Sequence, residues 1–465
     1  MRLNKLNKAS LIIITILFSS VFFLSCKEKS REGMIILTEV AADLQNINYV
    51  TGDSWRYISE SRILILNPKN PSNKPELLTK DFFSACSPNI SFDGRFMIFA
   101  AQKKQNDVWQ VWEMNLSNFK VRQVTTTTEN CIDPVYLPDG TILFSKAPND
   151  NYLKTGHELF TCKSDGSNMQ QITFNPHSYF ASSVLKDGRV LTISRQLYPD
   201  QKNSILMVLR PDGSKGELFY QGEKINEILS QGQETNNGQV VFIAANNKER
   251  GNIIAINYNR PLHSERNLTS GIKGDFKSVS PMKLKKLLTT YRSSVNETYA
   301  LYEFDVAKKT LDKAIYKDKN YNVLEAFLVN THERPKKLPS EVNLNVKTGL
   351  LLCQDINFTE GHFVGNTKLS SKAVKIELLG INNSLGTVGV EKDGSFYLKV
   401  LADTPFRIQT INKNGEIVNG PSSWLYLRPS ERRGCVGCHL SNEQVPENRQ
   451  PLSVNKNPII IPVLK

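Results

Sequence analysis

The middle of the chain repeats one unit, and this repeat restricts the fold more than any other feature. Turn glycines at Gly94, Gly140 and Gly188 each follow an aspartate, and a weaker copy turns at Gly238 after an asparagine. The spacings are 46, 48 and 50 residues. Each copy holds four short alternating segments, and Asp-Gly or Asn-Gly between the first two marks a tight hairpin. One such unit cannot bury both its faces alone, so the period predicts a β-propeller.

The length of the repeat region predicts about six blades, with seven as the alternative. The run LKKLLTTYRSS (284–294) is interpreted as a fifth copy that has lost its Asp-Gly turn. The segments 64–67 and 76–79 have the pattern of two outer strands without an inner pair before them. We expect the far end of the region, around 323–330, to supply that inner pair and so close the ring.

A second all-β domain is predicted after the propeller, and Trp424 and Tyr426 are expected in its core. Between 349 and 429 alternating segments are separated by turn residues, which is typical of a small β-sandwich. The predicted order is a signal peptide (1–25), a tether (26–33), the propeller (34–332), a linker (333–340), the sandwich-like domain (341–430) and an irregular C-terminal segment (431–465).

The C-terminal segment contains C-x-x-C-H, formed by Cys435, Cys438 and His439. This spacing is typical of covalent attachment of a c-type haem, because two thiols reach the two vinyl groups and the histidine reaches the iron. A zinc knuckle would need two more ligands nearby, and a redox dithiol would be expected next to a βαβ unit. We therefore predict one covalent haem c, with His439 as an iron ligand.

The second axial ligand stays open at this stage. His362 is the candidate in the second domain, and the alternatives are a solvent-exposed loop histidine, an open iron position or a ligand such as His332 from the propeller. Arg428, Arg432 and Arg433 flank the motif and are candidates for pairing with haem propionates, with a basic surface turn as the alternative.

The N-terminus predicts export. Three basic residues precede an apolar run (11–24), and Ser25 leads to Cys26. This pattern is typical of a bacterial lipoprotein signal cleaved before an acylated cysteine. The alternative, a single membrane span, would need about 20 apolar residues. Haem attachment to C-x-x-C-H takes place outside the cytoplasm, so the two signals agree. Lys27 favours the outer membrane on its periplasmic side.

Composition adds little about function. The formal charge is +13, but no basic run is interleaved with aromatic residues, so we expect a solvated lysine-rich surface and no nucleic-acid partner. No catalytic triad, phosphate-binding loop or paired-carboxylate motif is found, so catalytic residues stay unknown. The remaining cysteines, Cys86, Cys131, Cys162 and Cys353, have no predicted pairing, and Cys353 is expected to be buried in a strand.

Both domains resemble the hydrazine synthase alpha-subunit-like family. The propeller stretches that carry the resemblance are WQVWEMNL (109–116), LPDG (137–140) and VLKDGRVL (184–191). Those of the second domain are GLLLCQD (349–355), KDGSFYLKVLADTPFRIQTINKNGE (392–416) and SWLYLRPSERRGCVGCH (423–439). The last run is the most specific, and the resemblance covers nearly the whole mature chain.

The resemblance implies a c-type haem on Cys435 and Cys438, with His439 as the matching histidine. In hydrazine synthase a tyrosine shortly after the motif ligates the iron, and the motif histidine binds zinc. No tyrosine occurs in 440–443, so we expect ordinary ligation by His439. The enzyme also has a further haem domain, whereas this sequence has one C-x-x-C-H, so hydrazine synthesis is not predicted.

Three functions remain open from the sequence. The first is an exported, lipid-anchored monohaem protein that transfers electrons or senses a redox ligand, with a protein partner docked on the propeller. The second is a haem enzyme acting on a small nitrogen or oxygen species. The third is a propeller binding module whose haem motif has no catalytic role. The sequence leaves the oligomeric state undetermined.

Overall fold

The computed structural model describes residues 30–42, 57–70, 74–147, 156–222, 226–246, 250–283, 285–358, 363–364, 367–368, 372–437 and 448–462. This part of the chain contains no α-helix, only strands and short 3-10 turns, as the all-β prediction requires. It also contains no helix long and apolar enough to cross a bilayer.

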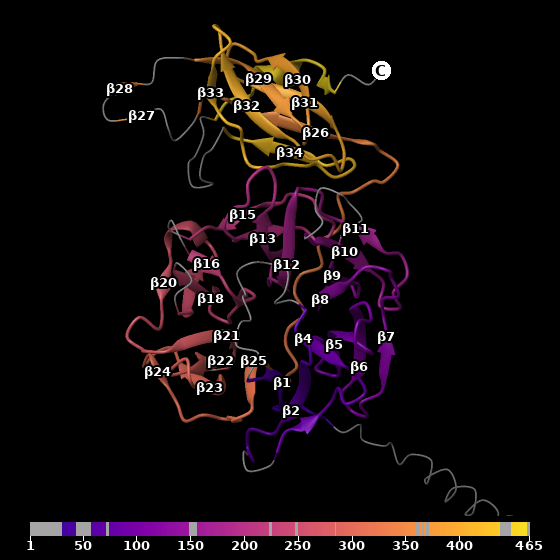
Figure 1. The fold of residues 1–465 in the computed structure, drawn as a ribbon. Helices are drawn as coiled ribbons and strands as arrows, with labels where there is room; N and C mark the ends of the chain where they lie inside the picture. The colour runs from indigo at the N-terminus through magenta and orange to yellow at the C-terminus, as the bar shows by residue number, and fades with distance from the viewer. Residues whose placement is uncertain are drawn as a thin grey trace, which may run out of the picture.

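Six antiparallel sheets stand around a central axis as the blades of a propeller (Figure 1). Blade 1 consists of β25 (Tyr321–Leu328), β1 (Ile35–Ala41), β2 (Arg62–Leu66) and β3 (Glu76–Leu77). Blade 2 consists of β4 (Ser84–Ile90), β5 (Phe96–Gln102), β6 (Gln110–Asn115) and β7 (Val121–Gln123). Blade 3 consists of β8 (Cys131–Tyr136), β9 (Ile142–Lys146), β10 (Glu158–Cys162) and β11 (Gln170–Gln171).

The other three blades follow the same plan. Blade 4 consists of β12 (His177–Val184), β13 (Val190–Gln196), β14 (Ile205–Leu209) and β15 (Glu217–Tyr220). Blade 5 consists of β16 (Asn226–Ile228), β17 (Gln233–Glu234), β18 (Gln239–Asn246), β19 (Asn252–Asn257) and β20 (Arg266–Asn267), with the turn η1 (Pro261–His263). Blade 6 consists of β21 (Asp275–Pro281), β22 (Lys286–Arg292), β23 (Ala300–Asp305) and β24 (Thr310–Leu311).

Blade 1 closes the ring with strands from both ends of the repeat region. The prediction of a mixed blade is confirmed, but the prediction that the far end supplies an inner pair is wrong. Only the innermost strand β25 comes from there, and the next strand is β1, which pairs with it antiparallel. The reason is burial: the run from Ile35 to Val40 is fully buried, so the N-terminal segment itself provides an apolar strand for the blade.

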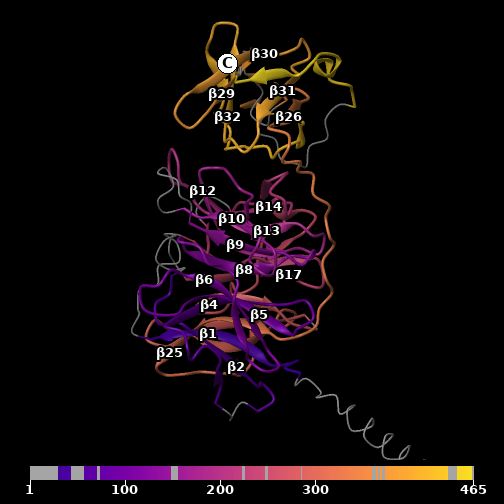
Figure 2. The same ribbon diagram turned by 90° about the vertical axis from the view of Figure 1, so that its right-hand side faces the viewer.

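The chain leaves blade 1 as a strap that crosses one face of the propeller (Figure 2). Its main chain bonds to the inner hairpin turns of two blades, from His332 N–H to the Phe92 carbonyl (3.0 Å) and from Lys336 N–H to the Lys186 carbonyl (3.1 Å). Between them the Arg334 guanidinium donates to the Pro138 carbonyl at 3.2 Å. The strap therefore touches blades 2, 3 and 4 in turn.

Turn glycines make this close passage possible. Gly188 has a φ of +92°, and a Cβ placed there would lie 2.0 Å from the Lys336 carbonyl oxygen. Gly140 has the same left-handed backbone, with φ +91°, but open space around the position of its Cβ. The Asp-Gly turn of blade 4 thus serves both as a hairpin and as the surface on which the strap lies.

The second domain is a sandwich of two four-stranded sheets (Figure 1). One sheet has the order β34 (Arg432–Cys435), β26 (Thr348–Cys353), β31 (Phe396–Leu401), β35 (Ile459–Ile461). The other has the order β30 (Ser384–Gly389), β29 (Ala373–Leu379), β32 (Arg407–Asn412), β33 (Ile417–Asn419). A small hairpin, β27 (Phe363–Val364) with β28 (Thr367–Lys368), and the turn η3 (Leu452–Asn455) complete it.

The prediction of an irregular tail from 431 onward is wrong for its described part. β34 and β35 pair in parallel with the two central strands of one sheet and form its two edges. Parallel partners at the edges are non-local pairings, which the sequence pattern does not show.

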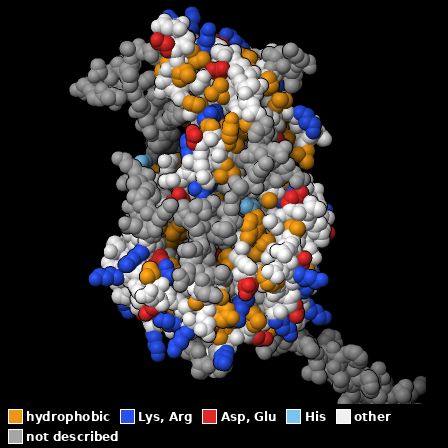
Figure 3. Space-filling view, viewed as in Figure 1, with side chains coloured by type: hydrophobic (Ala, Val, Ile, Leu, Met, Phe, Trp, Pro, Cys, Tyr) orange, Lys and Arg blue, Asp and Glu red, His pale blue; other side chains and the backbone are white. Residues whose placement is uncertain are grey.

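The sandwich lies against the rim of the propeller beside blades 3 and 4, away from the central axis (Figure 1). On the face shown in Figure 3, Lys and Arg side chains lie along the outer border of the molecule and alternate with acidic ones. This view agrees with a solvated basic surface.

Candidate functional site

The first cysteine of the motif belongs to a sheet. Cys435 ends β34 and is in register with Cys353 of β26, and the Gln354 N–H donates to its carbonyl at 2.9 Å. Cys353 is 1% exposed and belongs to the sandwich core, as predicted, while the partly buried Cys435 packs against that core. The backbone that presents the Cys435 thiol is therefore held on one side by β26.

Among the described residues, the neighbours of Cys435 leave its surroundings open. No described atom lies within 4 Å of the position that a Cβ would take at Gly434, and Val436 is 37% exposed. A half-buried thiol between two open neighbours fits the covalent attachment of haem. Cys438 and His439, which complete the motif, lie outside the described residues.

The other predicted ligand, His362, and the predicted lipidation site, Cys26, also lie outside the described residues. His332 is described, and the structure places it at the start of the strap. Its ring contacts the ring of Phe92 in blade 2, at a centroid distance of 5.3 Å. His332 therefore lies at the turn of blade 2, whereas the motif strand β34 lies beside blade 4 (Figure 1).

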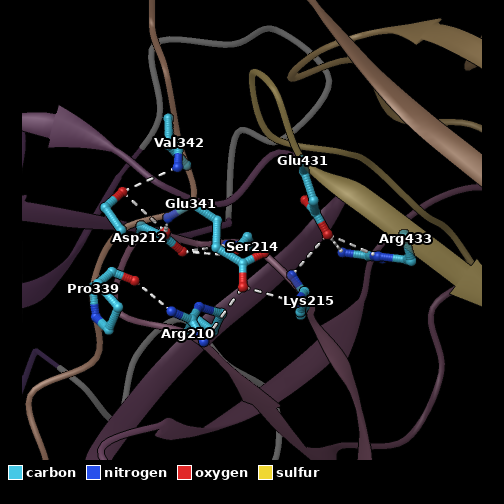
Figure 4. Close-up of polar contacts among 10 residues, drawn as sticks. Arg210, Asp212, Ser214, Lys215, Pro339, Glu341, Val342, Glu431 and Arg433 are labelled. Atoms are coloured by element: carbon cyan, nitrogen blue, oxygen red, sulfur yellow. Dashed lines mark hydrogen bonds and ion pairs between the residues drawn. The ribbon is translucent and has the colours of Figure 1, made fainter.

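Glu431 joins the motif strand to the propeller (Figure 4). Its side chain is fully buried, and its Oε1 accepts hydrogen bonds from the main-chain N–H of Lys215 (2.9 Å) and from Arg433 Nη2 (2.7 Å). Its Oε2 accepts from the Arg428 N–H at 2.8 Å. One carboxylate four residues before Cys435 thus binds the blade 4 turn, the preceding loop and the motif strand together.

Asp212 holds the end of the strap in the same turn (Figure 4). Its Oδ1 accepts from the Ser214 N–H and hydroxyl, and its Oδ2 accepts from the Glu341 N–H at 2.7 Å and the Ser340 hydroxyl at 3.0 Å. Burial alone would raise the pKa of Asp212, but these hydrogen bonds lower the pKa below its usual value. The carboxylate therefore stays ionised at neutral pH.

Two basic side chains of this turn reinforce the contact. Lys215 Nζ donates to Glu341 Oε1 at 2.8 Å, and Arg210 donates to the Pro339 carbonyl (Figure 4). We call these contacts, together with those of Asp212 and Glu431, the clamp. The clamp ties blade 4, the strap and the motif strand into one connected unit.

Alternate residues of the segment before the motif point into the propeller. Trp424 Nε1 donates to the Tyr198 carbonyl at 2.8 Å, and the Tyr426 hydroxyl lies 2.8 Å from the Gly213 carbonyl oxygen. The prediction that both aromatics belong to the sandwich core is wrong. Leu427 belongs to the sandwich core, and the intervening Leu425 packs against that core, so the alternation was correct but its two faces were exchanged.

Two of the three flanking arginines bind protein carboxylates. Arg428 is 3% exposed and pairs with Asp403 at 2.6 Å, and Arg433 pairs with Glu431. Burial raises the pKa of Asp403, and Arg428 offsets part of that rise. Arg432 is exposed and is the one of the three that remains a candidate for a haem propionate.

The two cysteines of blade 3, Cys131 and Cys162, are buried free thiols. Burial raises the pKa of Cys162 to about 12. A thiol with such a pKa is a poor nucleophile at neutral pH. Among the described residues no three His, Cys, Asp or Glu side chains cluster as a metal site.

Sequence reasoning did not find the clamp. Asp212 and Gly213 form another Asp-Gly pair, which the sequence shows only as a turn between outer strands. Glu431 looks like one acid in a basic stretch. The sequence contains one indication of this contact, an acidic residue at 431 and an arginine at 433 directly before the motif.

Comparisons with known proteins agree with this architecture. Residues 350–440 match the model of the hydrazine synthase alpha subunit middle domain. The hydrazine synthase subunit alpha of Kuenenia stuttgartiensis is 22% identical over 83% of this chain, which spans 63% of the length of that relative. The solved hydrazine synthase of that organism covers 92% of this chain and 72% of its own, with a TM-score of 0.78 and 19% identity.

A second solved structure, TolB from Acinetobacter baumannii, covers 72% of this chain and 73% of its own at 12% identity, with a TM-score of 0.48. The hydrazine synthase structure shares the fold of both domains, and the family model covers the segment from β26 through the cysteine motif. The chain is therefore similar to the hydrazine synthase alpha subunit: residues 350–440 match its middle-domain family, and the fold is shared over both domains.

Proposed function

We propose that the protein is an exported, lipid-anchored monohaem c-type protein that transfers electrons or senses a redox ligand, with a protein partner on the propeller. The supporting observation is the position of Cys435. It ends a strand fastened to β26 on one side and to the blade 4 turn through Glu431 on the other. Residues held by such surrounding hydrogen bonds keep a site in one geometry.

In this proposal Cys435 and Cys438 hold the haem and His439 binds its iron. Each thiol S–H adds across one vinyl C=C, forming an S–C and a C–H bond, so attachment needs no net oxidant. The bound haem supplies one-electron chemistry at its iron. The chain contributes the rest: β34 orients the first thiol, the sandwich core shields it on one side, and Arg432 offers a cation to a propionate.

The first experiment asks whether the haem is present. The full chain is produced with a c-type maturation system and analysed by haem staining after denaturing electrophoresis and by intact mass. We expect one covalent haem in the wild type and none in the Cys435→Ala, Cys438→Ala double variant. A Cys131→Ala variant, in the propeller, is the matched control and should keep the haem. A wild-type chain without covalent haem would refute the proposal.

The optical spectrum separates electron transfer from catalysis. A low-spin spectrum means that both axial positions are filled, and a His362→Ala variant then tests the sixth ligand. Binding of nitric oxide, carbon monoxide or cyanide to a high-spin iron would favour the alternative, a haem enzyme for a small nitrogen or oxygen species. Because the named relative is a hydrazine synthase subunit, product assays of such an enzyme should include hydrazine.

Lipid anchoring is tested separately. Cys26→Ala should abolish incorporation of labelled fatty acid and release the protein from the outer-membrane fraction. Haem attachment should persist in that variant if a signal for export remains. Unchanged membrane association of Cys26→Ala would contradict the anchor and leave the haem proposal untouched.

A further inference from the structure

The innermost strands of the propeller share an interruption at the same height. In blades 2, 3, 4 and 6 the pairing register of the inner strand shifts at its middle, and in blade 1 it shifts where β25 pairs with β1. In blade 5 the inner edge is split into two short strands, β16 and β17, with a gap between them. Bulges of this kind turn a residue out of the ladder.

The interrupted positions repeat with the period of the blades. They fall at Leu324, Ser87, Asp133, Ala181, Leu229 and Lys277, in blades 1 to 6. Successive positions along the chain are 46 to 48 residues apart. Ser87, Asp133 and Ala181 have φ values of +53°, +51° and +51°, so three adjacent blades use the same left-handed bulge. We call these six residues the axial ring.

All six residues of the axial ring line one cavity on the propeller axis, with a volume of about 50 Å³. One water needs roughly 10–15 Å³ of such volume, so the cavity has room for a molecule of only a few heavy atoms. Polar side chains outside the ring, among them Gln231 and Glu325, also line it. The cavity is therefore small, lined by both polar and apolar side chains, and built by every blade.

Two members of the ring have ionisable side chains, and they belong to opposite blades. Asp133 belongs to blade 3 and Lys277 to blade 6, which lie on opposite sides of the six-bladed ring (Figure 1). One arc between them holds Ala181 and Leu229, and the other holds Leu324 and Ser87. The ring thus has a negative pole, a positive pole and mostly apolar sides.

Hydrogen bonds hold the negative pole in place. Asp133 Oδ1 accepts from the Ser87 hydroxyl and Oδ2 from the Ala181 N–H, both at 2.8 Å. Glu325 Oε2 accepts from the Ser87 N–H at 3.1 Å and from the Thr38 hydroxyl at 3.2 Å. The carboxylates of Glu325 in blade 1 and Asp133 in blade 3 are thus linked through Ser87 of blade 2 between them, which gives this side of the cavity a fixed negative field.

We propose that the axial ring binds a small zwitterion of amino-acid size, with its ammonium group toward Asp133 and its carboxylate toward Lys277. A simple cation would meet Lys277, and a simple anion would meet Asp133 and Glu325. A zwitterion satisfies both poles, and its short aliphatic part lies between Ala181, Leu229 and Leu324. This site is separate from the cysteine motif at the rim and does not depend on haem.

The positive pole is tuned for such a ligand. Burial lowers the pKa of Lys277 to about 7. The charge of Asp275 raises this pKa, and the charge of Arg292 lowers it. The Tyr299 ring lies 5.8 Å from Lys277 Nζ. A carboxylate placed near Nζ favours the charged amine. Binding at pH 7 should therefore take up part of a proton, and affinity should fall as the pH rises above about 7.

Calorimetric titration of the full chain with glycine, β-alanine and γ-aminobutyrate tests the proposal. Acetate, propionate and methylammonium are the single-charge controls. We expect at least one zwitterion to bind at least ten-fold more tightly than every single-charge compound. The measured enthalpy should change with the ionisation enthalpy of the buffer, which reports the proton uptake.

Variants locate the site. Asp133→Asn and Lys277→Met should each weaken binding at least ten-fold, whereas Lys273→Met, an exposed lysine of the same blade, should not. If Asp133→Asn fails to fold, Ser87→Ala replaces it as the test of the negative pole. The proposal is overturned if no zwitterion binds at 10 mM, if single-charge compounds bind equally well, or if Lys277→Met binds as the wild type does.

Discussion

The carboxylate of Glu431 in the second domain accepts a hydrogen bond of 2.9 Å from the main-chain N–H of Lys215 in the propeller. The two residues are 216 positions apart, and Glu431 is fully buried where they meet. The contact connects the cysteine motif to the propeller, because Glu431 directly precedes β34, the strand that ends at Cys435. The predictions below test this coupling and the features around it.

Removal of the Glu431 carboxylate should loosen the motif strand. Glu431→Ala leaves the Arg433 guanidinium and the Arg428 and Lys215 N–H groups without their acceptor, so we expect a loss of about 3 kcal/mol in the free energy of unfolding. Hydrogen exchange of the amides in 431–435 should become faster. Glu341→Ala removes a more exposed carboxylate of the same clamp and should cost about 1 kcal/mol or less. Equal losses in the two variants would contradict a special role for Glu431.

Two glycine variants isolate the docking of the strap. Gly140→Ala and Gly188→Ala impose the same left-handed strain, at φ +91° and +92°, which costs about 1 kcal/mol. Only the second places a Cβ against the Lys336 carbonyl, at 2.0 Å, so the strap must shift. We expect Gly188→Ala to unfold at a clearly lower urea concentration and to be cleaved faster by trypsin within 333–340. Identical behaviour of the two variants would mean that the strap contact contributes nothing.

Tyr426→Phe should weaken the contact between the two domains. The lost hydroxyl lies 2.8 Å from the Gly213 carbonyl oxygen and 3.1 Å from that of Ile172, and both acceptors are buried with it. A loss of about 1–2 kcal/mol in the free energy of unfolding is expected. Tyr397→Phe, on a partly buried face of β31, serves as the control and should change stability by less than about 0.5 kcal/mol. A larger loss of unfolding free energy in Tyr397→Phe than in Tyr426→Phe would show that the interior of the sandwich matters more for stability than the contact between the domains.

Stability should fall in mild acid because of His177. Burial, together with the charge of Lys202, lowers the pKa of His177 to about 3, whereas an unfolded histidine has its usual pKa near 6.5. Between these values the unfolded chain binds the extra proton, so the free energy of unfolding decreases as the pH falls, by up to about 1.4 kcal/mol per pH unit. Above pH 6.5 both states are neutral and the contribution vanishes.

Urea unfolding of the wild type and of His177→Gln at pH 4, 5, 6 and 7 measures this effect. The variant should have the flatter profile below pH 6.5, although its stability at pH 7 should be lower because the hydrogen bond between Ser194 Oγ and His177 Nδ1 is lost. Parallel profiles would show that His177 takes up its proton in the folded protein at the same pH as in the unfolded chain.

Much of the architecture follows from local signals. The turn glycines Gly94, Gly140 and Gly188 set a period that only stacked four-stranded blades satisfy, and six blades are present. Cys353 was recognised as buried because it stands in an apolar strand. These predictions succeed because a hairpin turn and an alternating strand are encoded within about ten residues.

The predictions that failed depend on contacts between distant segments. The alternation around Trp424 showed two faces but not which of them meets the propeller. The strand β35 is paired in parallel with β31, although Lys399 and Ile460, the middle pair, are 61 positions apart, so its local sequence resembles a tail.

The repeat, the all-β class and the C-x-x-C-H motif are evident in the sequence, because each depends on residue types at fixed local spacing. Folding alone brings Glu431 to Lys215, Gly188 under the strap, and Asp133 and Lys277 to the lining of one cavity. The cause is that closing the ring and docking the sandwich are long-range events. They bring together side chains and main-chain groups whose separation along the chain leaves no pattern in the sequence itself.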